Sequence, residues 1–117
     1  MTQDERGAAT AELVLAIPLL LSLTVGLVWL LSVGAAQIRM VDAAREAARA
    51  AARGDPVAEA ESRAEQIAPP GSTIAVRSGE RDVVSTATGS VDAPGGLLGF
   101  LPAVRLQARA VAAREAP

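Results

Sequence analysis

The sequence contains no cysteine and no histidine. These two absences exclude a thiol nucleophile, a disulfide framework, a Cys/His zinc cluster and a histidine general base. Asp, Glu, Ser and Arg remain, so the absences weigh against an enzyme without forbidding one. We therefore expect a protein without catalytic residues, cofactor, metal or small-molecule substrate.

Bulky side chains are scarce outside one segment. The chain has one Trp, one Phe and no Tyr. A soluble part of about 80 residues with this composition would be marginal alone, because small domains bury little of their surface. We expect a membrane or neighbouring subunits to stabilise it. All eleven basic residues are arginine and the net charge is −2, so no basic field favours nucleic acid as a partner.

One long uncharged run is present, from Leu13 to Ala36. About 20 apolar residues cross the hydrocarbon layer of a membrane, so this run predicts a single membrane-spanning helix. The apolar core of a secretory signal has only about 7–15 residues, which disfavours cleavage near Ala36 and a secreted product.

The helix is predicted to continue beyond the membrane through residues 37–53, an Ala/Arg-rich segment of good helix formers. Gly54-Asp55-Pro56 should end it, because glycine suits a helix C-terminus and proline cannot continue one. This extension buries little apolar surface by itself, so we expect it to need a partner surface. Its expected apolar stripe consists of Ile38, Val41, Ala44, Ala48 and Ala51.

The pattern of residues 54–117 predicts a small α/β region. Asp55 is expected to cap a second helix with Pro56 at its first position, and Pro69-Pro70-Gly71 closes that helix. Alternating apolar and polar residues then predict a strand around Ile74 and Val76, and a Val/Thr/Ser-rich segment at 83–91 predicts a second.

An apolar loop follows these two segments, around Leu97 to Leu101, and alternation resumes at 103–112. We interpret this last segment as a third strand, although its alanine content also permits a helix. The expected fold is α+β, with a long N-terminal helix, a second short helix and an antiparallel sheet of about three strands, near the minimum for stability.

The N-terminal segment carries the most information. A glutamate, Glu12, stands at the start of the apolar run, five residues after Gly7. A carboxylate at the centre of a bilayer costs about 2.5–3.5 kcal/mol on insertion scales and less near the interface, so position alone permits an interfacial charge. The spacing, with a charged leader before Gly7, resembles the type IV prepilin signal.

More specifically, the chain resembles the TadE-like minor pilins of tight-adherence (Flp-type) pilus systems, in their short actinobacterial form. The matching stretches are RGAATAELVLAIPLLL, VDAAREAARAAARGD, LLGFLP and VRLQARAVAA. The resemblance implies a pilin-like fold and four parts. These are a leader (1–7), the transmembrane part of the helix (8–36), its extramembrane extension (37–53) and the C-terminal region (54–117).

The resemblance also implies roles for individual residues. A prepilin peptidase would cut between Gly7 and Ala8, leaving residues 8–117. The new amine on Ala8 would then pair with Glu12 of a neighbouring subunit and favour correct axial register, since paired charges avoid the cost of lying alone in an apolar bundle. Pro18 is expected to bend the helix near residues 14–18.

Ser22 and Gly26 form a small-xxx-small pair that would let another helix approach closely. The expected partners are accordingly the prepilin peptidase, other pilin or pseudopilin subunits, the pilus assembly platform and membrane lipid.

The resemblance places the N-terminus in the cytoplasm and the C-terminal region outside the membrane. The charge distribution conflicts with this orientation, because the four arginines of the extension outnumber Arg6, the single basic side chain of a leader that also holds Asp4 and Glu5. We favour the prepilin interpretation, since the Gly7–Glu12 spacing is more specific than a charge count. The alternative is a single-pass subunit of another secretion or envelope complex, uncut at Gly7.

Overall fold

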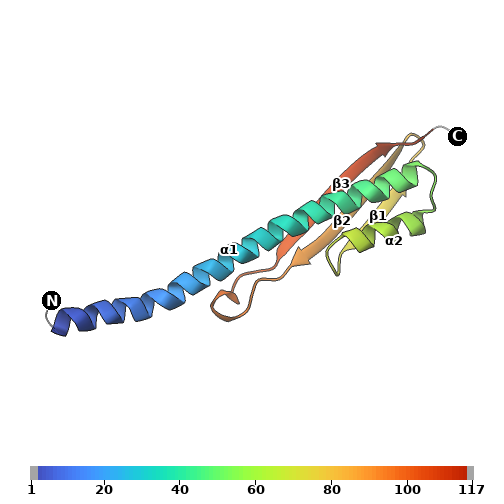
Figure 1. Cartoon of the computed structure of the whole chain (residues 1–117). Helices are drawn as coiled ribbons and strands as arrows, with labels where there is room; N and C mark the ends of the chain where they lie inside the picture. The colour runs from blue at the N-terminus through green and yellow to red at the C-terminus, as the bar shows by residue number, and fades with distance from the viewer. Residues whose placement is uncertain (1–2, 116–117) are drawn as a thin grey trace.

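A computed structural model describes residues 3–115 of the chain. The elements follow in the order α1 (Gln3–Ala52), α2 (Val57–Ile67), β1 (Thr73–Ser78), β2 (Asp82–Val91), a short 3-10 turn η1 (Gly96–Leu98) and β3 (Val104–Ala113). The molecule measures 84 × 20 × 17 Å. The N-terminal half of α1 projects as a rod, and the other elements gather along its C-terminal half (Figure 1). We call these gathered elements the head.

Helix α1 is unbroken from Gln3 to Ala52, at the end of the Ala/Arg-rich segment. Its C-terminus has a glycine in the left-handed region, Gly54 at φ +99°. The N–H of Gly54 donates to the carbonyl of Ala51, and the N–H of Asp55 donates to that of Ala50, both at 3.1 Å. This pair of bonds is the Schellman arrangement, which satisfies carbonyls that the helix leaves open. The predicted stop is confirmed.

Helix α2 begins one residue later than the sequence suggested. Pro56 occupies the N-cap position without a side-chain cap, so the prediction that Asp55 caps this helix is wrong. The carboxylate of Asp55 instead lies 3.5 Å from the guanidinium groups of Arg53 and Arg63. Charge attraction from two arginines therefore competes with the backbone N–H groups for this side chain.

The three strands form one antiparallel sheet in the order β1-β2-β3. Central β2 pairs Ala87 with Ile74 of β1 and with Ala108 of β3, and all three side chains are buried. Residues 104–113 are a strand because β2 offers a full-length partner, which outweighs the helix propensity of their alanines. The predicted α+β fold, with a long helix, a short helix and a three-stranded antiparallel sheet, is confirmed.

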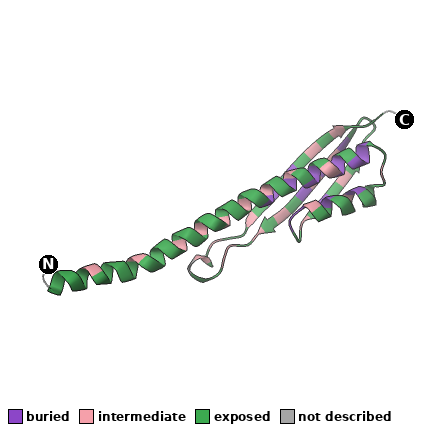
Figure 2. Ribbon diagram, viewed as in Figure 1, coloured by how far each residue is buried: buried purple, intermediate pink, exposed green. Residues whose placement is uncertain are grey.

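The core lies between one face of this sheet and the C-terminal half of α1, with α2 alongside (Figure 2). Alanines provide most of it, because their small side chains let helix and sheet backbones approach closely. The scarcity of aromatic residues is thereby explained, since the core is thin. The partner surface that the extension (37–53) was expected to need is the sheet and α2 of the same chain.

The predicted stripe on the extension is only partly correct. Ala44, Ala48 and Ala51 are buried as expected, whereas Ile38 is 64% exposed. Met40, absent from the predicted stripe, is fully buried. Alanine lies on every side of this segment, so its periodicity alone could not identify the face that the sheet covers.

Gly89 of β2 marks the closest approach between the sheet and α1. A Cβ added there would lie 2.5 Å from Cε of Met40 and 2.8 Å from Oγ of Ser72. We expect Gly89→Ala to lower the free energy of unfolding by about 1–3 kcal/mol through overpacking, because Met40 is fully buried and has little space to move. Thermal unfolding of the full chain in detergent, followed by circular dichroism, measures this.

The matched control is Gly34→Ala, where an added Cβ meets nothing within 4 Å. That substitution removes a glycine from a helix interior and should leave stability unchanged or raise it by about 1 kcal/mol. Equal melting temperatures for Gly89→Ala and the parent would contradict the close approach at Met40.

Candidate functional site: the N-terminal segment of α1

Gly7 and Ala8 lie on an exposed, helical part of the chain. Helix α1 already begins at Gln3, so the proposed cut site is inside its first turns. Both residues are exposed, and a Cβ added at Gly7 would meet nothing within 4 Å. The fold therefore does not require glycine at this position. A requirement for glycine would have to come from a partner that handles this segment.

Glu12 is exposed and lies four residues after Ala8. Residues four apart share one face of a helix, with Cβ atoms about 5–6 Å from each other. An amine created on Ala8 would therefore lie on the same face of α1 as Glu12. Between Arg6 and Arg39, Glu12 is the one charged side chain in the sequence.

Beyond Glu12 the helix is apolar on all sides. Its Leu, Val and Ile side chains from Leu13 to Leu31 are between 46% and 75% exposed, whereas Trp29 is half-buried. Figure 2 shows this half of α1 as exposed along most of its length. A helix that is apolar all round belongs inside a membrane or a larger assembly. By length and composition α1 can cross a membrane, with a mean hydropathy of 2.5 over its best 18-residue window and none of that window buried.

Hydroxyl groups in this apolar stretch are satisfied within the helix. Ser22 Oγ donates to the carbonyl of Pro18 at 2.8 Å, and Thr24 Oγ1 donates to that of Leu20 at 2.9 Å. Ser32 Oγ donates to the carbonyl of Trp29 at 2.7 Å. Unsatisfied polar groups are costly in hydrocarbon, so these bonds lower the cost of burying the helix in lipid.

Pro18 lies inside α1, and the helix continues on both sides of it. Its ring removes the N–H that would bond to the preceding turn. Ser22 bonds to the carbonyl of Pro18 itself, which ties the proline to the following turn. The bend near residues 14–18 stays a prediction.

Ser22 and Gly26 face a different neighbour from the one expected. Both line an apolar groove of about 360 Å³ that the β2–β3 connection also borders, through Leu98 and Leu101. Leu98 Cδ1 lies 3.5 Å from the place of a Cβ at Gly26. The small side chains thus admit a loop of the same chain, and close approach of another helix stays a prediction.

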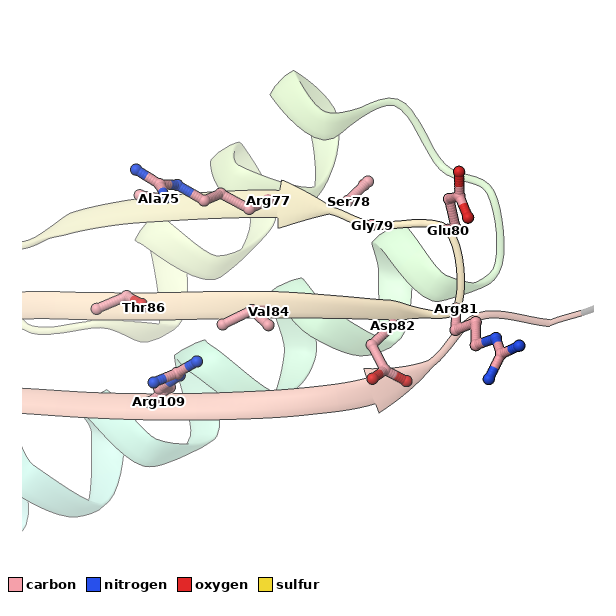
Figure 3. Close-up of a pocket in the computed structure, with 10 residues that line it drawn as sticks. All are labelled: Ala75, Arg77, Ser78, Gly79, Glu80, Arg81, Asp82, Val84, Thr86 and Arg109. Carbon is pink, nitrogen blue, oxygen red and sulfur yellow. The ribbon is translucent and has the colours of Figure 1, made fainter.

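Sequence reasoning assigned no role to the open face of the sheet. Arg77 and Arg109 occupy polar positions of the alternating segments, but only the register shows which side chains lie together. Thr86 of β2 is paired with Arg109 of β3 and with Ala75 of β1, while Arg77 is paired with Val84. These residues and the β1–β2 turn line a hollow of about 800 Å³ (Figure 3).

Two guanidinium groups, those of Arg77 and Arg109, extend from the outer strands at this hollow, on either side of β2 (Figure 3). Both arginines are exposed, as are Glu80, Arg81 and Asp82 at the turn end. Charges of both signs on a shallow, open surface suit contact with another protein surface better than enclosure of a small ligand.

Comparison with known proteins bears on α1. A family model described as TadE-like protein matches residues 7–49. The match begins at Gly7, runs through Glu12 and the apolar half of α1, and ends within the part of α1 that packs against the sheet. Neither a curated protein nor a solved structure matches the chain.

Proposed function

We propose that this chain is a minor pilin or pseudopilin of a Tad (Flp-type IV) pilus. The match of residues 7–49 to the TadE-like family model supports a Tad pilus-associated protein. In this proposal a prepilin peptidase cuts the chain after Gly7, and α1 then takes part in pilus assembly or priming. The supporting observation is the Gly7–Glu12 spacing at the start of a helix that exposes large apolar side chains on all sides.

The apolar half of α1 needs a lipid environment before assembly and helix neighbours after it. Burying apolar surface yields about 25 cal/mol per Å², so a helix this exposed is strongly disfavoured in water. In lipid the contacts between helices depend on close packing, which the small residues of α1 assist. Membrane lipid, other pilin or pseudopilin subunits and the assembly platform are therefore the proposed partners.

Glu12 would act once Gly7 is removed. The amine of Ala8 is then cationic, and Glu12 is the charge of opposite sign available in the apolar bundle. Attraction between the two reaches further than apolar contact in a medium of low dielectric constant. In the correct axial register the amine of one subunit meets Glu12 of its neighbour. In another register this pairing between subunits is lost, and the cost of burying the charges without it disfavours that register.

The head is proposed to lie outside the cytoplasmic membrane, with the N-terminus in the cytoplasm. Its mixed-charge open face, including Arg77 and Arg109, would contact neighbouring subunits. The protein would act through assembly and without a cofactor, and separate ATPase and platform proteins would supply the energy for movement. The arginines at positions 39, 45, 49 and 53 oppose this orientation by the positive-inside count.

The intact mass of the membrane-derived protein tests the cut. We expect loss of residues 1–7 when the peptidase is active and a full-length chain when it is inactive. A single cysteine at residue 80 should react with an impermeant reagent added to whole cells, because Glu80 is exposed. It belongs to the β1–β2 turn, which lies at the end of the head remote from the N-terminal half of α1 (Figure 1).

Each of three results would contradict part of the proposal. A full-length chain despite active peptidase would favour the uncut membrane subunit of another complex, and a start near Ala36 would indicate a secreted product. Protection of residue 80 in intact cells, with labelling after lysis, would show that the head faces the cytoplasm as the arginine count suggests.

A further inference from the structure

The connection between β2 and β3 is apolar along its length. Residues 93–103 contain only Ala, Pro, Gly, Leu and Phe, and the charged residues Asp92 and Arg105 flank this region of the chain. We call residues 93–103 the apolar loop. Phe100 within it is 79% exposed. A loop on the surface of a soluble domain ordinarily carries polar residues, so this composition needs a cause.

The apolar loop extends from the head back along α1 (Figure 1). Leu98 approaches Gly26 in the middle of the uncharged run. Gly95 and Leu98 border a second groove, of about 270 Å³, together with Pro18 and Ser22. The loop therefore lies beside the part of α1 that is long and apolar enough to cross a membrane.

The polar boundary of the loop coincides with that of α1. Val33 of α1 packs against the same core cluster as Val91 and Val104, the residues at the two strand ends that adjoin the loop. The side-chain amide of Gln37 donates to the carbonyl of Gln107 at 3.1 Å. Asp92 and Arg105 thus lie near the level at which α1 regains polar and charged residues, Gln37 and Arg39.

From this coincidence we propose that the apolar loop enters the membrane leaflet on the side of the head, beside α1, with lipid acyl chains covering Phe100. The inference rests on the proposed anchoring of α1 in the membrane. A segment that contacts Gly26 must share its depth, so if α1 spans the bilayer the loop lies in hydrocarbon. The lipid-facing surface of α1 continues without interruption onto the loop.

The backbone of the loop is suited to that depth. Pro94 and Pro102 have no N–H to satisfy. The N–H of Gly99 donates to the carbonyl of Gly96 at 3.0 Å, and that of Leu101 to the carbonyl of Leu98 at 3.1 Å. These features reduce the number of unpaired donors, which are costly in lipid. The head is then held at the membrane by two elements, which restricts its tilt relative to the membrane surface.

The test measures the depth of the loop in vesicles. The chain has no cysteine, so a single-cysteine variant can be made without first replacing native cysteines. Full-length chains with Cys at Phe100, Leu20 or Glu80 are labelled with the fluorophore NBD and placed at low density in phosphatidylcholine/phosphatidylglycerol vesicles. A fourth variant, Gly95→Cys, retains Phe100 and is sterically open, because an added Cβ there meets nothing within 4 Å.

We expect the labels at 100 and 95 to behave like the mid-span label at 20. Their emission should be blue-shifted, nitroxide-labelled lipids should quench it, and external dithionite should bleach it slowly. The label at 80 should be bleached at once by dithionite, and nitroxide-labelled lipids should not quench its emission. If the label at 20 is in the membrane while the labels at 95 and 100 are in water, the inference about the loop is wrong. The proposed anchoring of α1 would still stand.

Two further outcomes are distinct from these. If the label at 20 is also aqueous, the membrane anchoring proposed for α1 is itself wrong, and the inference falls with it. If the labels at 95 and 100 resist dithionite but nitroxide lipids do not quench them, protein rather than lipid covers the loop, which also overturns the inference.

Discussion

Glu12→Ala should insert into the membrane and be cut normally, yet it should be largely lost from assembled pili. Insertion should be unimpaired or improved, because the substitution removes a charge from the edge of the apolar run. In the bundle the amine of Ala8 would lack its partner. Breaking a buried ion pair by removing one member costs about 3–5 kcal/mol, which corresponds to a decrease in incorporation on the order of a hundredfold or more.

The measurement is the ratio of variant to parent chain in purified pili against the same ratio in the membrane. Glu12→Gln is the matched control for shape, since it keeps the size of the side chain and removes the charge. If loss of the charge pair causes the defect, Glu12→Gln should be lost from pili as strongly as Glu12→Ala. Incorporation of both variants at the parental level would leave Glu12 with only its interfacial position.

Gly7→Leu should abolish trimming while leaving insertion and the fold intact. The structure removes the usual objection that the variant misfolds, because an added Cβ at Gly7 meets nothing within 4 Å. Replacing a helical glycine should in fact favour α1 locally by about 0.5–1 kcal/mol. We therefore attribute any loss of trimming to the peptidase, whose cleft must accept the side chain at this position.

Intact mass spectrometry of membrane fractions measures the effect, and the variant should retain residues 1–7. Gly34→Leu is the matched control, since Gly34 is also in α1 and equally open. It should be trimmed like the parent. Normal removal of residues 1–7 from Gly7→Leu would exclude Gly7 as the determinant of the cut and would return Gly7 to an ordinary helical glycine.

Local patterns in the sequence were sufficient for the elements. An uncharged run of spanning length predicted the apolar half of α1, and Gly54 predicted its end. Alternation at Ile74 and Val76 predicted β1. These signals depend on residues close together in the chain, so they can be read without the fold. The Gly7–Glu12 spacing is local in the same sense, and its role stays a prediction.

Local choice between competing partners was harder to predict. Asp55 has a side chain suited to capping α2, but two nearby arginines engage its carboxylate instead. Ile38 continues an apolar spacing, yet it is exposed and Met40 is buried. In both cases several groups could satisfy the same rule, and only the arrangement of the surrounding elements selects one.

Long-range features came only from the tertiary structure. The sequence by itself determined an apolar helix long enough to span a membrane, a helical extension and a set of short strands, because each follows from composition and period. The tertiary structure decided that the alanines of α1 meet the sheet, that Thr86 lies beside Arg109, and that Leu98 reaches Gly26. Each of these joins residues distant in the chain, so it depends on strand register and on helix–sheet packing.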